Sequence, residues 1–147
     1  LARIIKGVAV AGHKTVFAVH PRTSQLLYTG KPAEALKVAS NIEILPPQNY
    51  VEMVRLTAGS RKVITDSGGL RREAYMLGKP VISLIWFVWF KEMKRLGFKT
   101  TVSADSEKIV DAILNFEPKG ERPPLFGDGN AAERILKKIV SEVRNKT

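Results

Sequence analysis

The sequence predicts an α/β fold, a single domain in which a parallel β-sheet has helices on both faces. Short runs of β-branched and other apolar residues, typical of buried strands, alternate along the chain with segments of helical periodicity. This alternation produces βαβ units, whose strands are parallel and whose helices cover the sheet. The length of 147 residues is enough for one domain, 1–147, with a sizeable core, and the sequence contains no internal repeat.

Residues 1–58 are predicted to form two strands and four helices. Apolar residues recur at helical spacing from Leu1 to Ala11, so the chain opens in an amphipathic helix. This helix has neither an N-cap before it nor an initiator methionine, so we expect a further segment upstream. Pro21 suits the first turn of a helix, and Asn49 is a favoured N-cap. The predicted helices span 1–11, 21–27, 32–39 and 50–58, and the predicted strands span 15–19 and 41–45.

Residues 59–147 are predicted to form three strands and four helices. Asp105 or Ser106 caps the third of these helices, and a loop rich in proline and glycine follows it from 117 to 129. The predicted strands span 63–65, 81–85 and 99–102, and the predicted helices span 70–77, 90–96, 106–116 and 129–143. The last helix has an apolar stripe formed by Ile135, Leu136, Ile139, Val140 and Val143.

The stretch on which the functional prediction depends joins the strand at 63–65 to the helix that follows it. Ser67, Gly68 and Gly69 are predicted to form a tight polar turn at the point where the strand delivers the chain to a helix N-terminus. Glycines let a ligand approach the backbone closely, and the free N–H groups and the helix dipole favour an anion. Glu73 lies one turn into the helix and is able to face the same ligand. The turn therefore predicts a phosphate site, although most glycine turns after strands only reverse the chain.

Two further candidate residues follow other strands at the same predicted edge. Ligands of open parallel sheets bind outside the carboxyl ends of the strands. His20 follows the strand at 15–19, where a substrate contact and a backbone hydrogen bond are alternative roles. Tyr50 begins a helix and either borders a bound base or packs as an ordinary helix residue. We interpret Asp66 as bracing the turn through an Asx-type hydrogen bond, because no histidine is placed to form a catalytic triad with Ser67.

Composition excludes several classes of protein. The chain has no cysteine, which rules out disulfides and thiolate metal sites, and its two histidines, His13 and His20, lack metal-ligand spacing. The net charge of +10 is scattered rather than gathered in a nucleic-acid motif, so we expect a basic surface that attracts anionic nucleotides and no nucleic-acid partner. The longest uncharged apolar run, 80–90, is shorter than the ~20 residues that span a bilayer.

Two strings of residues resemble a known family. Thr65 to Leu70, continued by Glu73-Ala74 and by the residues from Leu77 to Val81, is similar to a motif of the non-hydrolysing UDP-N-acetylglucosamine 2-epimerases. The string from Phe126 to Ile135 resembles their closing motif. Val19 to Thr23 and Pro47 to Tyr50 also match the family pattern. The resemblance covers most of this chain and corresponds to the C-terminal half of a family member.

The resemblance implies a fold, a reaction and a set of ligand contacts. The fold is a Rossmann-like sheet, the C-terminal domain of a two-domain GT-B architecture. The reaction interconverts UDP-GlcNAc and UDP-ManNAc for cell-surface polysaccharide biosynthesis in the cytoplasm, by anti elimination of UDP and its readdition after inversion at C2. The carboxylates for this reaction come from the N-terminal domain, so we expect no catalytic residue, metal or cofactor here and no turnover by this chain alone. The residues implied to bind UDP or UDP-N-acetylglucosamine are His20, Tyr50, Ser67, Gly68, Gly69 and Glu73.

The sequence departs from the family pattern at two places. Arg71 and Arg72 replace a glutamine or glutamate and a glutamate after the glycines, so that only Glu73 of the acidic set is kept. Ile85 stands where the family has an arginine, and an aromatic cluster from Trp86 to Phe90 replaces the loop Thr-Glu-Arg-Pro-Glu, which helps to hold the diphosphate. Substitute cations for this role are Lys91, Lys94 and Arg72. The aromatic cluster predicts inter-element packing and an exposed interface patch.

Three questions stay open at the level of sequence. A GT-B glycosyltransferase donor domain and a non-catalytic interaction domain are the alternatives to the epimerase function. The family's sheet has a central first strand that would precede Leu1, so either its two neighbours close the gap or the domain depends on another segment. The partner is then a missing N-terminal domain or a second copy in a homodimer.

Overall fold

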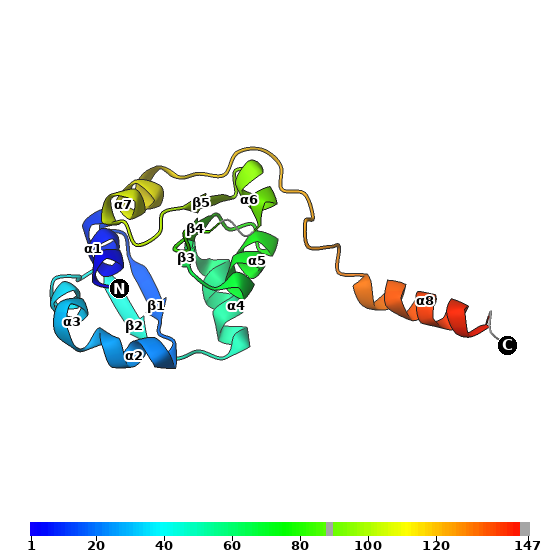
Figure 1. The fold of residues 1–147 in the computed structure, drawn as a ribbon, viewed down its shortest axis with the longest axis horizontal. Helices are drawn as coiled ribbons and strands as arrows, with labels where there is room; N and C mark the ends of the chain where they lie inside the picture. Colours follow the sequence, from blue (N-terminus) through cyan, green and yellow to red (C-terminus); the bar gives the residue numbers. More distant parts are fainter. Residues whose placement is uncertain (88–89, 145–147) are drawn as a thin grey trace.

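The computed structural model describes residues 1–87 and 90–144 and confirms the α/β class (Figure 1). Within these residues it contains five strands and eight helices in the predicted order. The strands are β1 (Thr15–Ala18), β2 (Ile42–Leu45), β3 (Val63–Thr65), β4 (Val81–Ser83) and β5 (Lys99–Thr101). The helices are α1 (Ala2–Ala11), α2 (Pro21–Leu27), α3 (Gly30–Lys37), α4 (Tyr50–Gly59), α5 (Gly68–Met76), α6 (Lys91–Arg95), α7 (Ser106–Asn115) and α8 (Ala131–Arg144).

The described strands form two parallel sheets instead of one. β1 pairs with β2, in a register that sets Thr15 opposite Ile42, and the second sheet has the order β3-β4-β5. Among the described residues no strand joins the two sheets. The neighbouring strands therefore do not close into the single sheet that a Rossmann-like domain has.

Helices α1 and α7 connect the two sheets through a shared apolar cluster. Val8 of α1 and Ile109 of α7 are buried together with Ile82 of β4, and both Ile42 of β2 and Ile64 of β3 pack against them. Figure 1 shows α7 beside α1, on the side away from α4 and α5. The contact between these two helices therefore determines how the carboxyl ends of the two sheets lie relative to each other.

A second cluster fixes α5, the helix that carries the glycines, against the sheet β3-β4-β5. Tyr75 is buried on α5, and its ring makes edge-to-face contacts with Phe98 and Phe126. The Tyr75 hydroxyl donates a hydrogen bond to the carbonyl of Pro123 at 2.7 Å, and Arg122 donates to the carbonyl of Tyr75 at 3.2 Å. The loop after α7 is thus held against α5, and α5 is anchored at its C-terminal end.

Helix α8 lies apart from the rest of the chain in Figure 1, at the end of an extended segment. All of its residues are exposed, including Ile135, Leu136, Ile139 and Val140 of the predicted apolar stripe. The periodicity of the stripe predicted the helix correctly, but the stripe is not part of the core. No helix in the described ranges has both the length and the apolar character needed to cross a membrane.

Candidate phosphate-binding site at the start of α5

The turn between β3 and α5 is held by two side-chain hydrogen bonds. Ser67 is the N-cap of α5, and its Oγ accepts a hydrogen bond from the Leu70 N–H at 3.3 Å. The Ser67 N–H in turn donates to Thr65 Oγ1 at 3.0 Å. Thr65 therefore braces the turn, and the prediction that Asp66 does so is wrong. Among the described residues, the side chain of Asp66 accepts no hydrogen bond from the turn, and its role there is taken by the Thr65 hydroxyl.

Gly68 and Gly69 belong to the first turn of α5, so the helix begins two residues earlier than predicted. The cap explains the difference, because Ser67 accepts from the third residue of the helix and lets both glycines take helical backbone angles. The first N–H groups of any helix lack an intrahelical acceptor. Among the described residues, none accepts a hydrogen bond from the N–H of Gly68 or of Gly69. These two donors are available to a ligand.

The fold itself does not require glycine at these two positions. Neither residue has a positive φ. A Cβ added at Gly68 would lie 3.7 Å from its nearest neighbour, and one added at Gly69 would lie 3.8 Å from Ser67 Oγ, which are both ordinary contacts. The absence of side chains instead leaves the backbone open to something outside the protein, as expected for a phosphate site.

Glu73 lies four residues after Gly69 and therefore on the same face of α5. It is half-buried, and no residue in the described ranges pairs with its carboxylate. It stands in the second turn of the helix, where a carboxylate gains little from the helix dipole. This position argues against the interpretation that Glu73 is a surface residue that only complements the helix dipole. Its carboxylate is available to accept hydrogen bonds from a ligand.

Arg71 is the residue that sequence reasoning missed. Its side chain is 0% exposed, and its Nε donates to the Ser67 carbonyl at 3.1 Å. Its Nη1 and Nη2 atoms are buried and have no hydrogen-bond partner among the described residues. The available signal was its position three residues after Gly68, which puts it beside that glycine on the helix surface.

The surroundings of Arg71 are electropositive. Burial lowers the pKa of Arg71 from its usual range, and Asp66 opposes this effect. Burial, and after it the charges of Arg71 and Lys94, lowers the pKa of Lys99. The N-terminus of α5 adds its partial positive charge at the same place. A negatively charged ligand would relieve the mutual repulsion of these groups.

His20 and Tyr50 follow the strands of the other sheet. His20 Nδ1 accepts a hydrogen bond from the Arg22 N–H at 3.2 Å, so that this side chain caps α2. With Nδ1 as an acceptor, a neutral ring carries its hydrogen on Nε2, which faces no described partner. Tyr50 is the first residue of α4 and is 68% exposed. No described hydrogen bond joins either residue to the α5 turn, and their part in a common site stays a prediction.

The segment after β4 contains no cation in place of the expected arginine. Ile85 is half-buried and Trp86 is 78% exposed, while Trp89 lies outside the described residues. Phe90 is half-buried with a φ of 58°, and the guanidinium carbons of Arg71 and Arg72 lie 5.6 and 5.7 Å from the centre of its ring. The aromatic cluster therefore approaches the start of α5 through Phe90.

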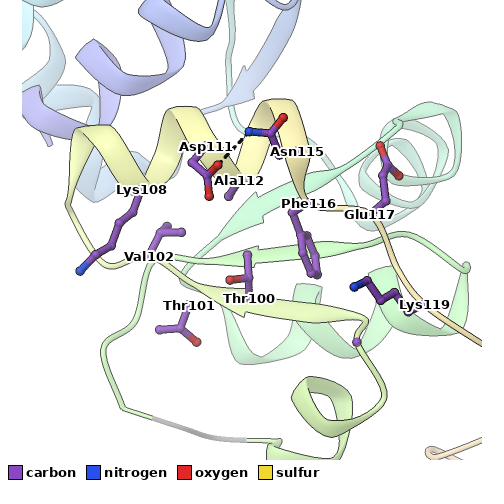
Figure 2. Close-up of a pocket in the computed structure, with 11 residues that line it drawn as sticks. Thr100, Thr101, Val102, Lys108, Asp111, Ala112, Asn115, Phe116, Glu117 and Lys119 are labelled. Atoms are coloured by element: carbon purple, nitrogen blue, oxygen red, sulfur yellow. Dashed lines mark hydrogen bonds between the residues drawn. The ribbon is translucent and has the colours of Figure 1, made fainter.

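A pocket of about 510 Å³ lies elsewhere, between α7 and β5 (Figure 2). Asp111 and Asn115 of α7, joined by a hydrogen bond of 2.8 Å, face it together with Thr100 of β5. None of the predicted site residues lines this pocket. Within the described ranges there is also no group of three or more histidine, aspartate or glutamate side chains that would hold a metal ion.

The fold is that of the parallel α/β proteins, a class in which phosphate groups commonly bind at a helix N-terminus. The sequence model of one family, described as UDP-N-acetylglucosamine 2-epimerase, matches residues 1–140. The chain therefore belongs to the UDP-N-acetylglucosamine 2-epimerase family.

Individual relatives agree with this assignment. A UDP-N-acetylglucosamine 2-epimerase homolog from Methanococcus maripaludis is 34% identical over 137 residues, which are 92% of this chain and 38% of the relative. The structure of UDP-GlcNAc 2-epimerase from Methanocaldococcus jannaschii superimposes with a TM-score of 0.79 at 29% identity, over 95% of this chain and 40% of that one. The same enzyme in complex with UDP-GlcNAc and UDP gives a TM-score of 0.77, over 95% of this chain and 39% of that one. The chain thus spans about two fifths of the length of these relatives.

Proposed function

We propose that this chain is the UDP-binding half of a UDP-N-acetylglucosamine 2-epimerase-like protein, which interconverts UDP-GlcNAc and UDP-ManNAc. The observation that carries the proposal is the capped start of α5, where the N–H groups of Gly68 and Gly69 have no described acceptor and neither residue has a side chain of its own. It is supported by the Methanocaldococcus jannaschii relative, whose solved complex contains UDP-GlcNAc and UDP.

The proposed contacts divide the nucleotide between the two sheets. The diphosphate accepts hydrogen bonds from the N–H groups of Gly68 and Gly69 and from the Ser67 hydroxyl, and the ribose hydroxyls donate to Glu73. Tyr50 borders the base, and His20 donates from Nε2 to the substrate. Because these last two residues follow the strands of the sheet β1-β2, full affinity requires that both sheets keep their relative position.

Turnover requires groups that this chain does not supply. In our proposal the carboxylates that move the C2 proton come from an N-terminal domain, and the partner of this chain is that domain or a second copy in a homodimer. This chain alone then binds the nucleotide and does not convert it. A cytoplasmic location belongs to the same proposal, as the family resemblance implies.

One observation favours a second candidate, a non-catalytic interaction domain derived from the epimerase fold. Trp86 is strongly exposed, and Ile85 stands where the family pattern has a cation. Such a domain would have lost nucleotide binding and would use its apolar surface to bind protein. Absence of any UDP binding would favour this candidate over the epimerase function.

Isothermal titration of the chain with UDP, uridine and UDP-N-acetylglucosamine tests the proposal. We expect weak binding of UDP, little further affinity from the sugar, and much weaker binding of uridine, because the free N–H groups bind phosphate. Gly69→Ala places a Cβ on the open backbone without a steric conflict inside the protein, and it should weaken UDP binding while the fold is kept. Gly59→Ala, at a site with no atom within 4 Å of the added Cβ, is the matched control. Equal affinities for uridine and UDP would show that the start of α5 is not a phosphate site.

A further inference from the structure

Arg71 is a buried cation whose hydrogen-bonding capacity is mostly unused. Its guanidinium has one described hydrogen bond, from Nε to the Ser67 carbonyl, and both terminal nitrogens are unpaired among the described residues. A buried charge without a partner destabilises a fold strongly, so such groups are normally paired. Asp66 is the acidic residue whose charge acts on the pKa of Arg71, but the two side chains form no ion pair.

The unpaired nitrogens lie beside the open backbone of α5. Nη2 is 3.7 Å from the position that a Cβ on Gly68 would occupy. The Nε hydrogen bond fixes the guanidinium at the first turn of the helix, which has eight further residues behind Gly68 and so a developed dipole. The unpaired Nη2 of Arg71 thus lies next to Gly68, whose N–H is also unpaired among the described residues.

The neighbouring side chains define how this cation is held. The ring of Phe90 lies over Arg71 on one side, and the same ring contacts Arg72, which is exposed. Phe90 has backbone angles that are costly for a non-glycine residue, at φ 58° and ψ 60°. The strained backbone of Phe90 and the buried charge of Arg71 therefore lie next to each other. Such a combination is typical of ligand sites.

We infer that Arg71 is a binding residue for a phosphate group, which accepts hydrogen bonds from its Nη1 and Nη2 and from the N–H groups of Gly68 and Gly69. A guanidinium is suited to this role because its two parallel N–H donors match two phosphate oxygens. Within the proposed function the ligand is the diphosphate of the nucleotide, and Arg71 replaces from α5 the cation that is absent at Ile85. The identity of the ligand as a nucleotide rests on the proposed function. The binding of a phosphate group by Arg71 does not.

Binding is measured for the intact chain and for three variants, by titration calorimetry with UDP, uridine and inorganic pyrophosphate and by thermal unfolding without ligand. We expect Arg71→Gln to weaken UDP and pyrophosphate about 10- to 100-fold, as for a lost hydrogen bond to a charged group. Uridine binding should not change, and the unfolding temperature of the free protein should stay equal or rise, because an unpaired buried charge is gone. Arg95→Gln removes the same charge from an exposed arginine of α6 and should change each affinity less than about threefold.

The outcomes separate the inference from the proposed function. Equal affinities of Arg71→Gln and Arg95→Gln for pyrophosphate would overturn the inference, and so would a wild-type chain that binds no pyrophosphate. If pyrophosphate binding depends on Arg71 but UDP binds no more tightly than pyrophosphate, the inference holds and the nucleotide function is rejected. If Arg71→Gln does not fold, Arg71→Lys keeps the charge and loses the paired donors. It should then bind pyrophosphate several-fold more weakly than wild type, with uridine binding unchanged, and unchanged pyrophosphate affinity would overturn the inference.

Discussion

Ser106, the first residue of α7, donates a hydrogen bond from its hydroxyl to the carbonyl of Arg3 in α1 at 2.7 Å, across 103 positions of the chain. This bond marks the contact between the two helices that connect the sheets β1-β2 and β3-β4-β5. At the same contact the two backbones approach so closely that only a glycine fits at position 7. A Cβ added there would lie 2.8 Å from the Ser106 carbonyl oxygen and 3.0 Å from Ile109 Cβ.

The first prediction follows from this close approach. Gly7→Ala should destabilise the chain by about 1–3 kcal/mol, because the neighbouring atoms include backbone and cannot move away freely. Gly59→Ala, at the end of α4 with open space around the added Cβ, should be neutral or slightly stabilising. Urea unfolding of both variants measures the difference. Equal stability of the two would show that the contact between α1 and α7 is looser than described.

The second prediction concerns Glu73. Replacement by alanine should cost ~1–3 kcal/mol of UDP binding, because a half-buried carboxylate that accepts from ribose hydroxyls is lost, and folding should change little. Calorimetric titration and thermal unfolding of Glu73→Ala provide the two measurements. If Glu73 is only a surface residue, UDP affinity will not change and stability will fall by a few tenths of a kcal/mol.

The third prediction concerns pH and the N-cap of α7. The backbone N–H of Lys108 is the largest cause that lowers the pKa of Asp105 below its usual value. Because the folded pKa lies below the unfolded one, of about 3.9, the carboxylate contributes its full stability above the unfolded pKa. This contribution is lost as pH falls through the folded pKa. Asp105→Ala should therefore unfold at a lower temperature than wild type at pH 7, and the difference should narrow below about pH 4. A difference that stays constant down to pH 2 would exclude the charge as its source.

The fourth prediction is that the chain self-associates through the aromatic cluster from Trp86 to Phe90. Trp86 is largely exposed, and exposed aromatic surface is usually covered by protein. The net charge of +10 opposes association, so that association should increase as salt screens the repulsion. Sedimentation at low and high salt should show less association for Trp86→Ser than for wild type. Val38→Ser, at another strongly exposed apolar side chain, is the control and should behave as wild type.

A monomer at both salt concentrations would contradict this prediction. The emission of the indole side chains gives an independent check. Fluorescence typical of a buried tryptophan would place the cluster in the core and not on the surface.

Local signals in the sequence were sufficient for most of the elements. Strand β3 and helix α2 have the predicted bounds, and Asn49 caps α4 as predicted, through its Oδ1 and the Glu52 N–H. These features depend on residues within a few positions of each other, such as Pro21 at the first turn of its helix. Strand β4 ends two residues before its predicted end, where its apolar run continues into the aromatic cluster.

The features that sequence could not predict depend on residues far apart in the chain. The division into two sheets follows from which strands pair, and the exposure of the α8 stripe follows from the absence of a packing partner in the described residues. Arg71 was interpreted as a departure from the family pattern, since it replaces a glutamine or glutamate. Its burial was not expected, because arginine is mostly exposed in proteins. The ring of Phe90 lies over its guanidinium, and the sequence places Phe90 nineteen positions away with no visible relation to Arg71.

The central claim is that a nucleotide diphosphate binds to the free N–H groups at the start of α5. The most direct test is to follow the backbone amide signals of the ¹⁵N-labelled chain by NMR while UDP is added. We expect the amide signals of Gly68 and Gly69 to show the largest downfield shifts, and we expect pyrophosphate, but not uridine, to reproduce these shifts. Shifts confined to the pocket between α7 and β5, with those of Gly68 and Gly69 unchanged at saturation, would contradict the central claim.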